Sequence, residues 1–339
     1  MPQFGLRMLL VIVSSTAIGC AWFVPWWNHT KQEAALVADI QILKPLLYYD
    51  YQFSELKEHY DPANCLAPAP KFLKAWFGEH LFGSVESFSV TGSSFYAEFP
   101  LGTTEVYRYS NEIDDAFQRI GEFKNLRFLS LHGCFGLSDL TMIKTLDKIE
   151  DLDLQACGAE DISPLKFASS LKTLNLGNCS SIEDLTPISH LSNLESLDLS
   201  QTRLSNYSCL AELPNLKSLS MLNLYENIED WSWLGEMKSL EEAWLDSSGL
   251  KRLPSLKKLN RLTSIHLSYC ADLESTAPLV DVKQLKHLWL GRGAPLQILE
   301  HLDELPDLES LYLQGIEVNK EEIASIQSKR PNLAIEVLD

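Results

Sequence analysis

Leucines alternate with polar residues in short segments that recur along most of the chain. In "LKTLNL" (171–176), Leu174 and Leu176 flank the polar Asn175, and this period of two predicts a half-buried strand. Nine such segments begin 22 to 24 residues apart, at Leu126, Ile149, Leu171, Leu194, Leu216, Leu240, Leu262, Leu285 and Leu308. A regular interval of this length predicts stacked structural repeats.

A second apolar series follows each segment at threefold spacing, as Ile182, Leu185, Ile188 and Leu191 do. It predicts a short helical or extended return that closes a coil. One coil cannot bury its own leucines, but stacked coils share a continuous core, and their strands form a parallel sheet with a spacing of about 4.8 Å. The pattern predicts an α/β solenoid over residues 126–339, with Leu333, Ile335 and Val337 in a closing strand.

The nine segments resemble the leucine-rich repeat, L-x-x-L-x-L-x-x-N/C-x-L, of the short bacterial and protein-phosphatase-regulator type. The stretch "IEDLTPISHLSNL" (182–194) is similar to the internalin pattern I-x-D-L-x-P-L-x-x-L-x-x-L. The resemblance implies a right-handed coil with a concave parallel sheet. It also implies that the ninth position points inward and bonds the backbone of the bend. That column reads Cys134, Cys157, Cys179, Thr202, Leu224, Ser248, Cys270, Gly293 and Ile316.

An uncharged segment of twenty residues, 8–27, precedes the repeats. A helix of that length spans about 30 Å, the thickness of a hydrocarbon core. We favour a retained transmembrane anchor over residues 1–30. A lipoprotein signal with Cys20 acylated and a cleaved or buried segment are the alternatives. The charges on the two sides nearly balance, so they do not decide the orientation.

Residues 31–125 lack the repeat pattern and predict a small α+β cap region. We expect helices over 31–43, 70–82 and 111–125 and a strand over 46–53, with 84–90 as a degenerate first strand of the solenoid. The N-terminal plan resembles a group of bacterial leucine-rich-repeat proteins anchored by one span, which implies that the repeats lie outside the cytoplasm. The matching residues are Phe4 to Leu10, Tyr49, Asp50, Ala75, Trp76, Gly83 and Val85.

Composition removes several functional classes. The formal net charge of −18 argues against nucleic acid as a partner. The seven cysteines are few and odd in number, no C-x-x-C pair occurs, and four of the seven fall in the inward column. We find no catalytic or cofactor-binding motif and therefore expect no enzyme activity, cofactor or metal.

The fifth residue of each segment points outward from the middle of its strand. It is small or polar in the first five segments and a ring in the last four, Trp244, His266, Trp289 and Tyr312. With Tyr269 nearby, and with Glu241, Glu242 and Asp246 as an acidic rim, these residues predict an exposed ridge on the concave face. The ridge is either a binding site or a row of strand-favouring rings that protects the sheet.

Two functions follow from this reading. One is a membrane-tethered module that binds a protein or a cell-envelope ligand through the ridge. The other is a structural or regulatory scaffold that organises a neighbouring membrane protein and has no specific concave-face ligand. The sequence leaves the identity of the ligand and the oligomeric state open.

Overall fold

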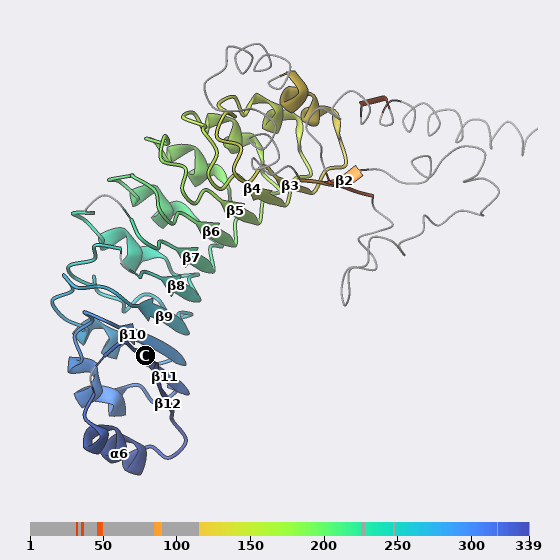
Figure 1. The fold of residues 1–339 in the computed structure, drawn as a ribbon. Helices are drawn as coiled ribbons and strands as arrows, with labels where there is room; N and C mark the ends of the chain where they lie inside the picture. Colours follow the sequence, from red (N-terminus) through yellow and green to blue (C-terminus); the bar gives the residue numbers. More distant parts are fainter. Residues whose placement is uncertain are drawn as a thin grey trace, which may run out of the picture.

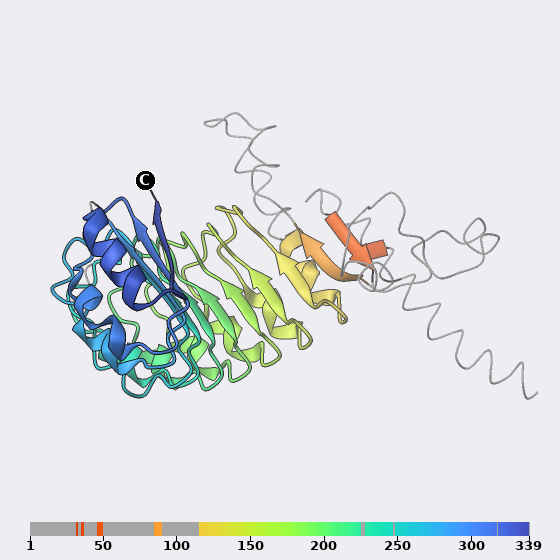
Figure 2. The ribbon, with the colours of Figure 1, turned by 90° about the horizontal axis from the view of Figure 1, so that it is seen from below.

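The repeated segments form one continuous, curved sheet. The computed structural model describes residues 32, 35–36, 46–49, 85–89, 115–224, 228–246, 248–316 and 318–338. Within them, twelve strands form one sheet in chain order. The strands line the inner side of an arc and the return segments lie on its outer side, as Figures 1 and 2 show.

Each of the nine predicted segments forms a strand. These strands are β3 (Phe128–Ser130), β4 (Asp151–Asp153), β5 (Thr173–Asn175), β6 (Ser196–Asp198), β7 (Ser218–Ser220), β8 (Glu242–Trp244), β9 (Ser264–Leu267), β10 (His287–Gly291) and β11 (Ser310–Gln314). Neighbours are parallel and in register, so that Leu152, Leu174 and Leu197 lie side by side. These leucines are almost completely buried, which confirms the predicted shared core.

The returns are mostly 3-10 helices. They are η4 (Thr141–Thr145), η5 (Ser163–Phe167), η6 (Thr186–His190), η7 (Ser208–Glu212), η8 (Ser232–Glu236), η9 (Ala277–Asp281) and η10 (Gln297–Glu304). The return between β8 and β9 contains no helix in its described residues. The sequence predicted returns that are either helical or extended, and both occur.

A polar side chain precedes six of these returns. Its oxygen accepts a hydrogen bond of 2.7 to 3.1 Å from the backbone N–H two residues later, which has no partner within the helix. The six residues are Asp139, Asp161, Asp184, Asn206, Asp230 and Ser275. Asp184, the aspartate of the internalin-like pattern, lies one residue before the N-cap and bonds the first backbone N–H of the 3-10 turn.

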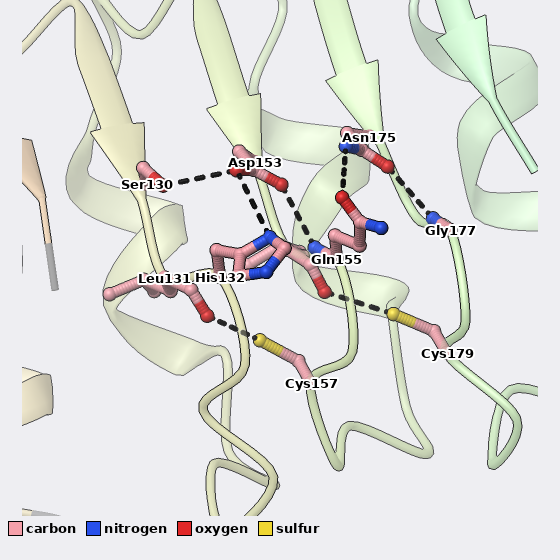
Figure 3. A network of polar contacts seen from close by, with 10 residues as sticks. Ser130, Leu131, His132, Asp153, Gln155, Cys157, Asn175, Gly177 and Cys179 are labelled. Atoms are coloured by element: carbon pink, nitrogen blue, oxygen red, sulfur yellow. Dashed lines mark hydrogen bonds and ion pairs between the residues drawn. The ribbon is translucent and has the colours of Figure 1, made fainter. Parts of the chain in front are cut away.

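The inward cysteines bond backward along the solenoid. The thiols of Cys157 and Cys179 donate to the carbonyl oxygens of Leu131 and Leu154, at 3.1 and 3.0 Å (Figure 3). Each acceptor belongs to the preceding coil, whereas we expected bonds within the bend itself. Thr202 does bond its own bend, through Leu199 O at 2.7 Å. The inward thiols thus link one coil to the coil before it, whereas the Thr202 hydroxyl holds its own bend.

The bends also require a left-handed residue, which the sequence pattern did not reveal. In seven coils the residue immediately before the inward column has a positive φ, and five of the seven are not glycine. They are Gly133, Ala156, Asn178, Gln201, Asn223, Tyr269 and Gly315. Among the three departures from the column, Leu224 and Ile316 pack partly buried against the core, while Gly293 is exposed with a φ of 90°.

The N-terminal side of the solenoid is capped by strands. β2 (Val85–Ser89) pairs with β3 in parallel, which confirms the expected first strand, and β1 (Leu46–Tyr49) pairs with β2 antiparallel. Within the expected helix at 111–125, residues 115–119 are helical and continue into η3 (Ile120–Glu122). The apolar segment 8–27 and the expected helix at 70–82 lie outside the described residues, and no helix found among the described residues could cross a membrane.

At the other end, β12 (Ala334–Leu338) pairs in parallel with β11, as predicted for a closing strand. Helix α6 (Lys320–Lys329) precedes it, and Arg330 follows the helix. The Arg330 guanidinium donates to the carbonyl oxygens of Leu302, Leu305 and Leu308 at 2.6, 2.9 and 3.1 Å. One cation thereby joins the end of the α6 return to the backbone of the preceding return, η10, and to the start of the ninth segment.

The column cysteines should be unreactive in the folded protein. Burial raises the pKa of the Cys179 thiol to about 11, so that almost no thiolate forms at neutral pH. We expect Cys134, Cys157, Cys179 and Cys270 to resist a bulky maleimide until denaturant unfolds the chain, as measured by mass spectrometry of labelled peptides. A Ser192→Cys variant, on an exposed return, is the rapidly labelled control. Rapid native labelling of the column would contradict its burial.

Arg330 should stabilise the end of the solenoid. Replacing it by leucine leaves its acceptor carbonyl groups without their charged donor, so Arg330→Leu should lower the free energy of unfolding by about 2–3 kcal/mol. Arg252→Leu is the matched control, because Arg252 is 81% exposed and meets Glu274 only at 3.7 Å. Urea denaturation compares the two. Equal losses would show that the Arg330 contacts contribute nothing specific.

Candidate binding surface on the concave face

The four predicted rings form a continuous stack across four strands. Trp244 and His266 lie 3.4 Å apart between ring centroids, His266 and Trp289 3.8 Å, and Trp289 and Tyr312 4.2 Å. The planes are inclined by only 16°, 12° and 7°. The in-register pairing of β8 to β11 brings these side chains together. We name Trp244, His266, Trp289 and Tyr312 the ring ladder.

The ladder differs from the exposed ridge expected from the sequence. Because the rings stack face to face, His266 and Trp289 have both faces covered and present only their edges. His266 is 3% exposed, so the expectation of an exposed side chain was wrong for this residue. Trp244, Trp289 and Tyr312 are partly buried. Contacts between aromatic rings contribute about 0.5–1.5 kcal/mol per pair, so the ladder also stabilises the solenoid.

His266 is held neutral inside the ladder. Burial between the two indoles, and then the nearby His287, lower the pKa of His266 from its ordinary 6.5 to about 3. Its Nε2 atom lies 3.4 Å from the Ser264 hydroxyl. A neutral imidazole stacks between the tryptophans without the desolvation penalty of a cation.

Two further predicted site residues lie differently. Tyr269 is 52% exposed, has a φ of 56°, and takes part in no ring contact with the described residues. A bulky side chain with this backbone conformation is uncommon. Asp246 accepts a hydrogen bond from the backbone N–H of Ser268, and burial raises the pKa of its carboxyl group. Asp246 therefore supports the neighbouring strand, and its carboxylate is not a free part of an acidic rim.

The first half of the concave face is a polar network. Asp153 accepts from the Ser130 hydroxyl at 3.0 Å and from the backbone N–H of Gln155 at 3.0 Å (Figure 3). Asn175 accepts from Gly177 N and donates to the side chain of Gln155. Here Asp153 and Asn175, the fifth residues of their segments, bond the backbone N–H two residues later. In the ring ladder the fifth residues stack on one another instead.

A row of alternating charge borders this surface. The second residue of each segment is Arg127, Glu150, Lys172, Glu195, Lys217, Glu241, Thr263, Lys286 and Glu309. Glu150 meets Arg127 and Lys172 at 2.8 and 2.7 Å, and Lys217 meets Glu195 at 2.7 Å. Hydrogen bonds from Lys172 and then Arg127 hold the pKa of Glu150 below its ordinary value. Reading down the second position of the segments would have revealed this alternation, which our sequence analysis missed.

The register, the 3-10 returns and the inward donors define a leucine-rich-repeat solenoid. The predicted likeness to leucine-rich-repeat proteins, internalins among them, is confirmed at the level of the fold. One similar solved structure is internalin C2 of Listeria monocytogenes, with 21% identity, a TM-score of 0.39, and coverage of 81% of this chain and 96% of that chain. A second internalin of the same organism has 19% identity, a TM-score of 0.40, and coverage of 84% and 98%.

A plant protein is similar over part of its length. The leucine-rich-repeat ectodomain of an Arabidopsis thaliana membrane receptor kinase has 20% identity and a TM-score of 0.45, with 76% of this chain and 30% of that chain covered. No family model matches the sequence, and no curated protein matches it.

The ring ladder should make the protein sensitive to acid. Below pH 6.5 the unfolded chain protonates its histidine at this position, while the folded chain does not until about pH 3. Protonation in that window therefore favours unfolding. As the pH is lowered through this window, the free energy of unfolding should decrease by up to about 1.4 kcal/mol per pH unit because of this group alone.

A His266→Phe variant keeps a ring in the ladder and removes the group whose protonation causes this pH dependence. Its urea stability should fall less steeply between pH 6.5 and 4 than that of the unchanged protein. His190→Phe, at an exposed position on a return, should keep the original slope. An unchanged slope in His266→Phe would show that the buried imidazole does not control the acid response.

Proposed function

We propose that this protein is a binding module that recognises a protein or another cell-envelope ligand through the ring-bearing half of its concave face. The ring ladder is the observation that carries the proposal. Two tryptophans, a tyrosine and a histidine occupy four successive outward positions, where a solenoid needs only polar residues for solubility. Tryptophan and tyrosine are frequent anchors of protein interfaces.

The local architecture supports a recognition surface. Strands β3 to β8 are three residues long, but β9, β10 and β11 have four, five and five residues. The sheet is therefore wider at three of the four strands that carry the rings. Stacked rings on longer strands lose little conformational entropy on binding, which favours affinity.

We further propose that residues 8–27 tether the module to a membrane as a single span, with the repeats on the extracytoplasmic side. The twenty uncharged residues of that segment support this part. The alternative is a scaffold in which the repeats only organise a neighbouring membrane protein. The two functions differ in whether binding depends on the ladder.

Substitutions in the ladder test the proposal. The full-length, tagged protein is cross-linked in its own membranes, and the captured partner is quantified for each variant. Trp244→Ala and Trp289→Ala should each weaken binding by about 1–4 kcal/mol, because each removes an anchor ring. Circular dichroism should show that both variants remain folded at the assay temperature.

Phe167→Ala is the matched control. Phe167 is an aromatic residue that is 50% exposed on the return η5, away from the concave face. Its loss should leave capture unchanged. If folded Trp244→Ala and Trp289→Ala variants capture the partner as well as the unchanged protein does, the scaffold is the correct function.

A further inference from the structure

The ring ladder ends abruptly at Trp244. One face of its indole stacks on His266, and the other is turned to strand β7. Among the described residues no ring or cation stacks on that second face. Every interior ring of the ladder has two stacking partners, so Trp244 lacks one on this side.

The neighbouring residues are too small to supply that partner. Ser220 pairs with Trp244 across the strands, and its hydroxyl lies 2.9 Å from the hydroxyl of Ser200, toward the preceding coil. Ser218 bonds the Glu242 carboxylate at 3.4 Å. We name the Trp244 face together with Ser218, Ser220 and Glu242 the ladder step.

The surface around the step is acidic. The two outward positions of strands β3 to β12 contain no lysine or arginine, and they contain Asp151, Asp153, Asp198 and Glu242 between β4 and β8. The alternating row beside them holds four basic and four acidic side chains and is neutral as a whole. The carboxylates of the outward positions therefore give this part of the concave face a net negative charge.

Two of these carboxyl groups, Asp151 and Asp153, lie on the same strand and repel one another when both are charged. Burial and then the charge of Asp153 raise the pKa of the Asp151 carboxyl group. Asp198, opposite Ser220, uses one carboxylate oxygen to accept from Ser200 N at 2.8 Å. A positively charged ligand would relieve this repulsion along the strip from the step toward β4.

We propose that the ladder step binds an arginine side chain of an extended, basic segment of the partner protein, with its guanidinium stacked on Trp244. This assignment rests on the proposed function and specifies the chemistry of the partner. The guanidinium is planar, so it can stack on the indole face in the position that a further ring of the ladder would occupy on the β7 side. Its in-plane N–H groups can then donate to the carboxylates of Glu242 and Asp198.

Other ligand chemistries fit less well. A neutral sugar could also stack on the free face of Trp244, but it would bring no positive charge to the carboxylates of Glu242 and Asp198. A nucleic acid would be repelled by the acidic strip. Lysine shares the charge of arginine but has no plane to stack, and it is more strongly hydrated.

Three synthetic peptides separate charge from planarity. Each has a fluorescent label and alternates lysine with serine, and the central residue is arginine, lysine or citrulline. Citrulline keeps the planar shape of arginine without the charge. Fluorescence anisotropy with the full-length protein in non-ionic detergent should show about three- to tenfold tighter binding of the arginine peptide than of either other peptide.

Two variants locate the preference. Ser220→Tyr adds a ring beside Trp244 and should abolish the arginine preference while the lysine peptide still binds. Phe167→Ala, which removes an exposed aromatic residue on the return η5, should retain the preference. Loss of the preference in Phe167→Ala, or its retention in Ser220→Tyr, would overturn the assignment.

The peptide experiment can overturn the arginine site without overturning the proposed function. Equal affinities for the three peptides, or no binding of any of them, would overturn the arginine site. The concave-face proposal would still stand if cross-linked capture depends on Trp244 and Trp289. If capture does not depend on them but the arginine preference is present and Ser220→Tyr removes it, the step binds arginine and the wider ladder is not the partner site.

Discussion

Burial of leucine between successive coils is the interaction on which the rest of this structure depends. A three-residue strand with a 3-10 return encloses too little volume to remove its own apolar side chains from water. Each coil therefore needs a neighbour on both sides. The parallel register that aligns Leu152, Leu174 and Leu197 satisfies this need, and it places every other equivalent position side by side as well.

The aligned positions give each row of side chains its own physical role. The leucine rows supply apolar burial. The thiol and hydroxyl groups of the inward column donate hydrogen bonds to backbone carbonyl oxygens. The row of second residues pairs opposite charges, and the row of fifth residues changes from hydrogen-bonded polar groups to stacked rings between Ser220 and Trp244. The same backbone thus presents two chemically different surfaces without any change of fold.

The sequence predicted the strands, the core and the ring positions, because the leucine period determines them directly. It also identified β2 and β12 as the terminal strands through their alternating apolar residues. It could not show that His266 is buried, since the exposure of one ring depends on the rings of adjacent coils. The contacts of Arg330 join residues 22 to 28 positions apart and have no local signature. The binding role of the rings is still a prediction.

The alternating row of charge restricts how the array can change in length. Loss of the one coil that begins at Leu171 would place Glu150 beside Glu195, and two carboxylates would meet where a lysine now separates them. Loss of two successive coils would instead place Glu150 beside Lys217 and restore an attractive pair. Each such pair is worth only about 0–1 kcal/mol at the surface. An even number of inserted or deleted coils keeps opposite charges side by side, whereas an odd number brings like charges together. The row therefore favours changes by even numbers of coils within this part of the solenoid.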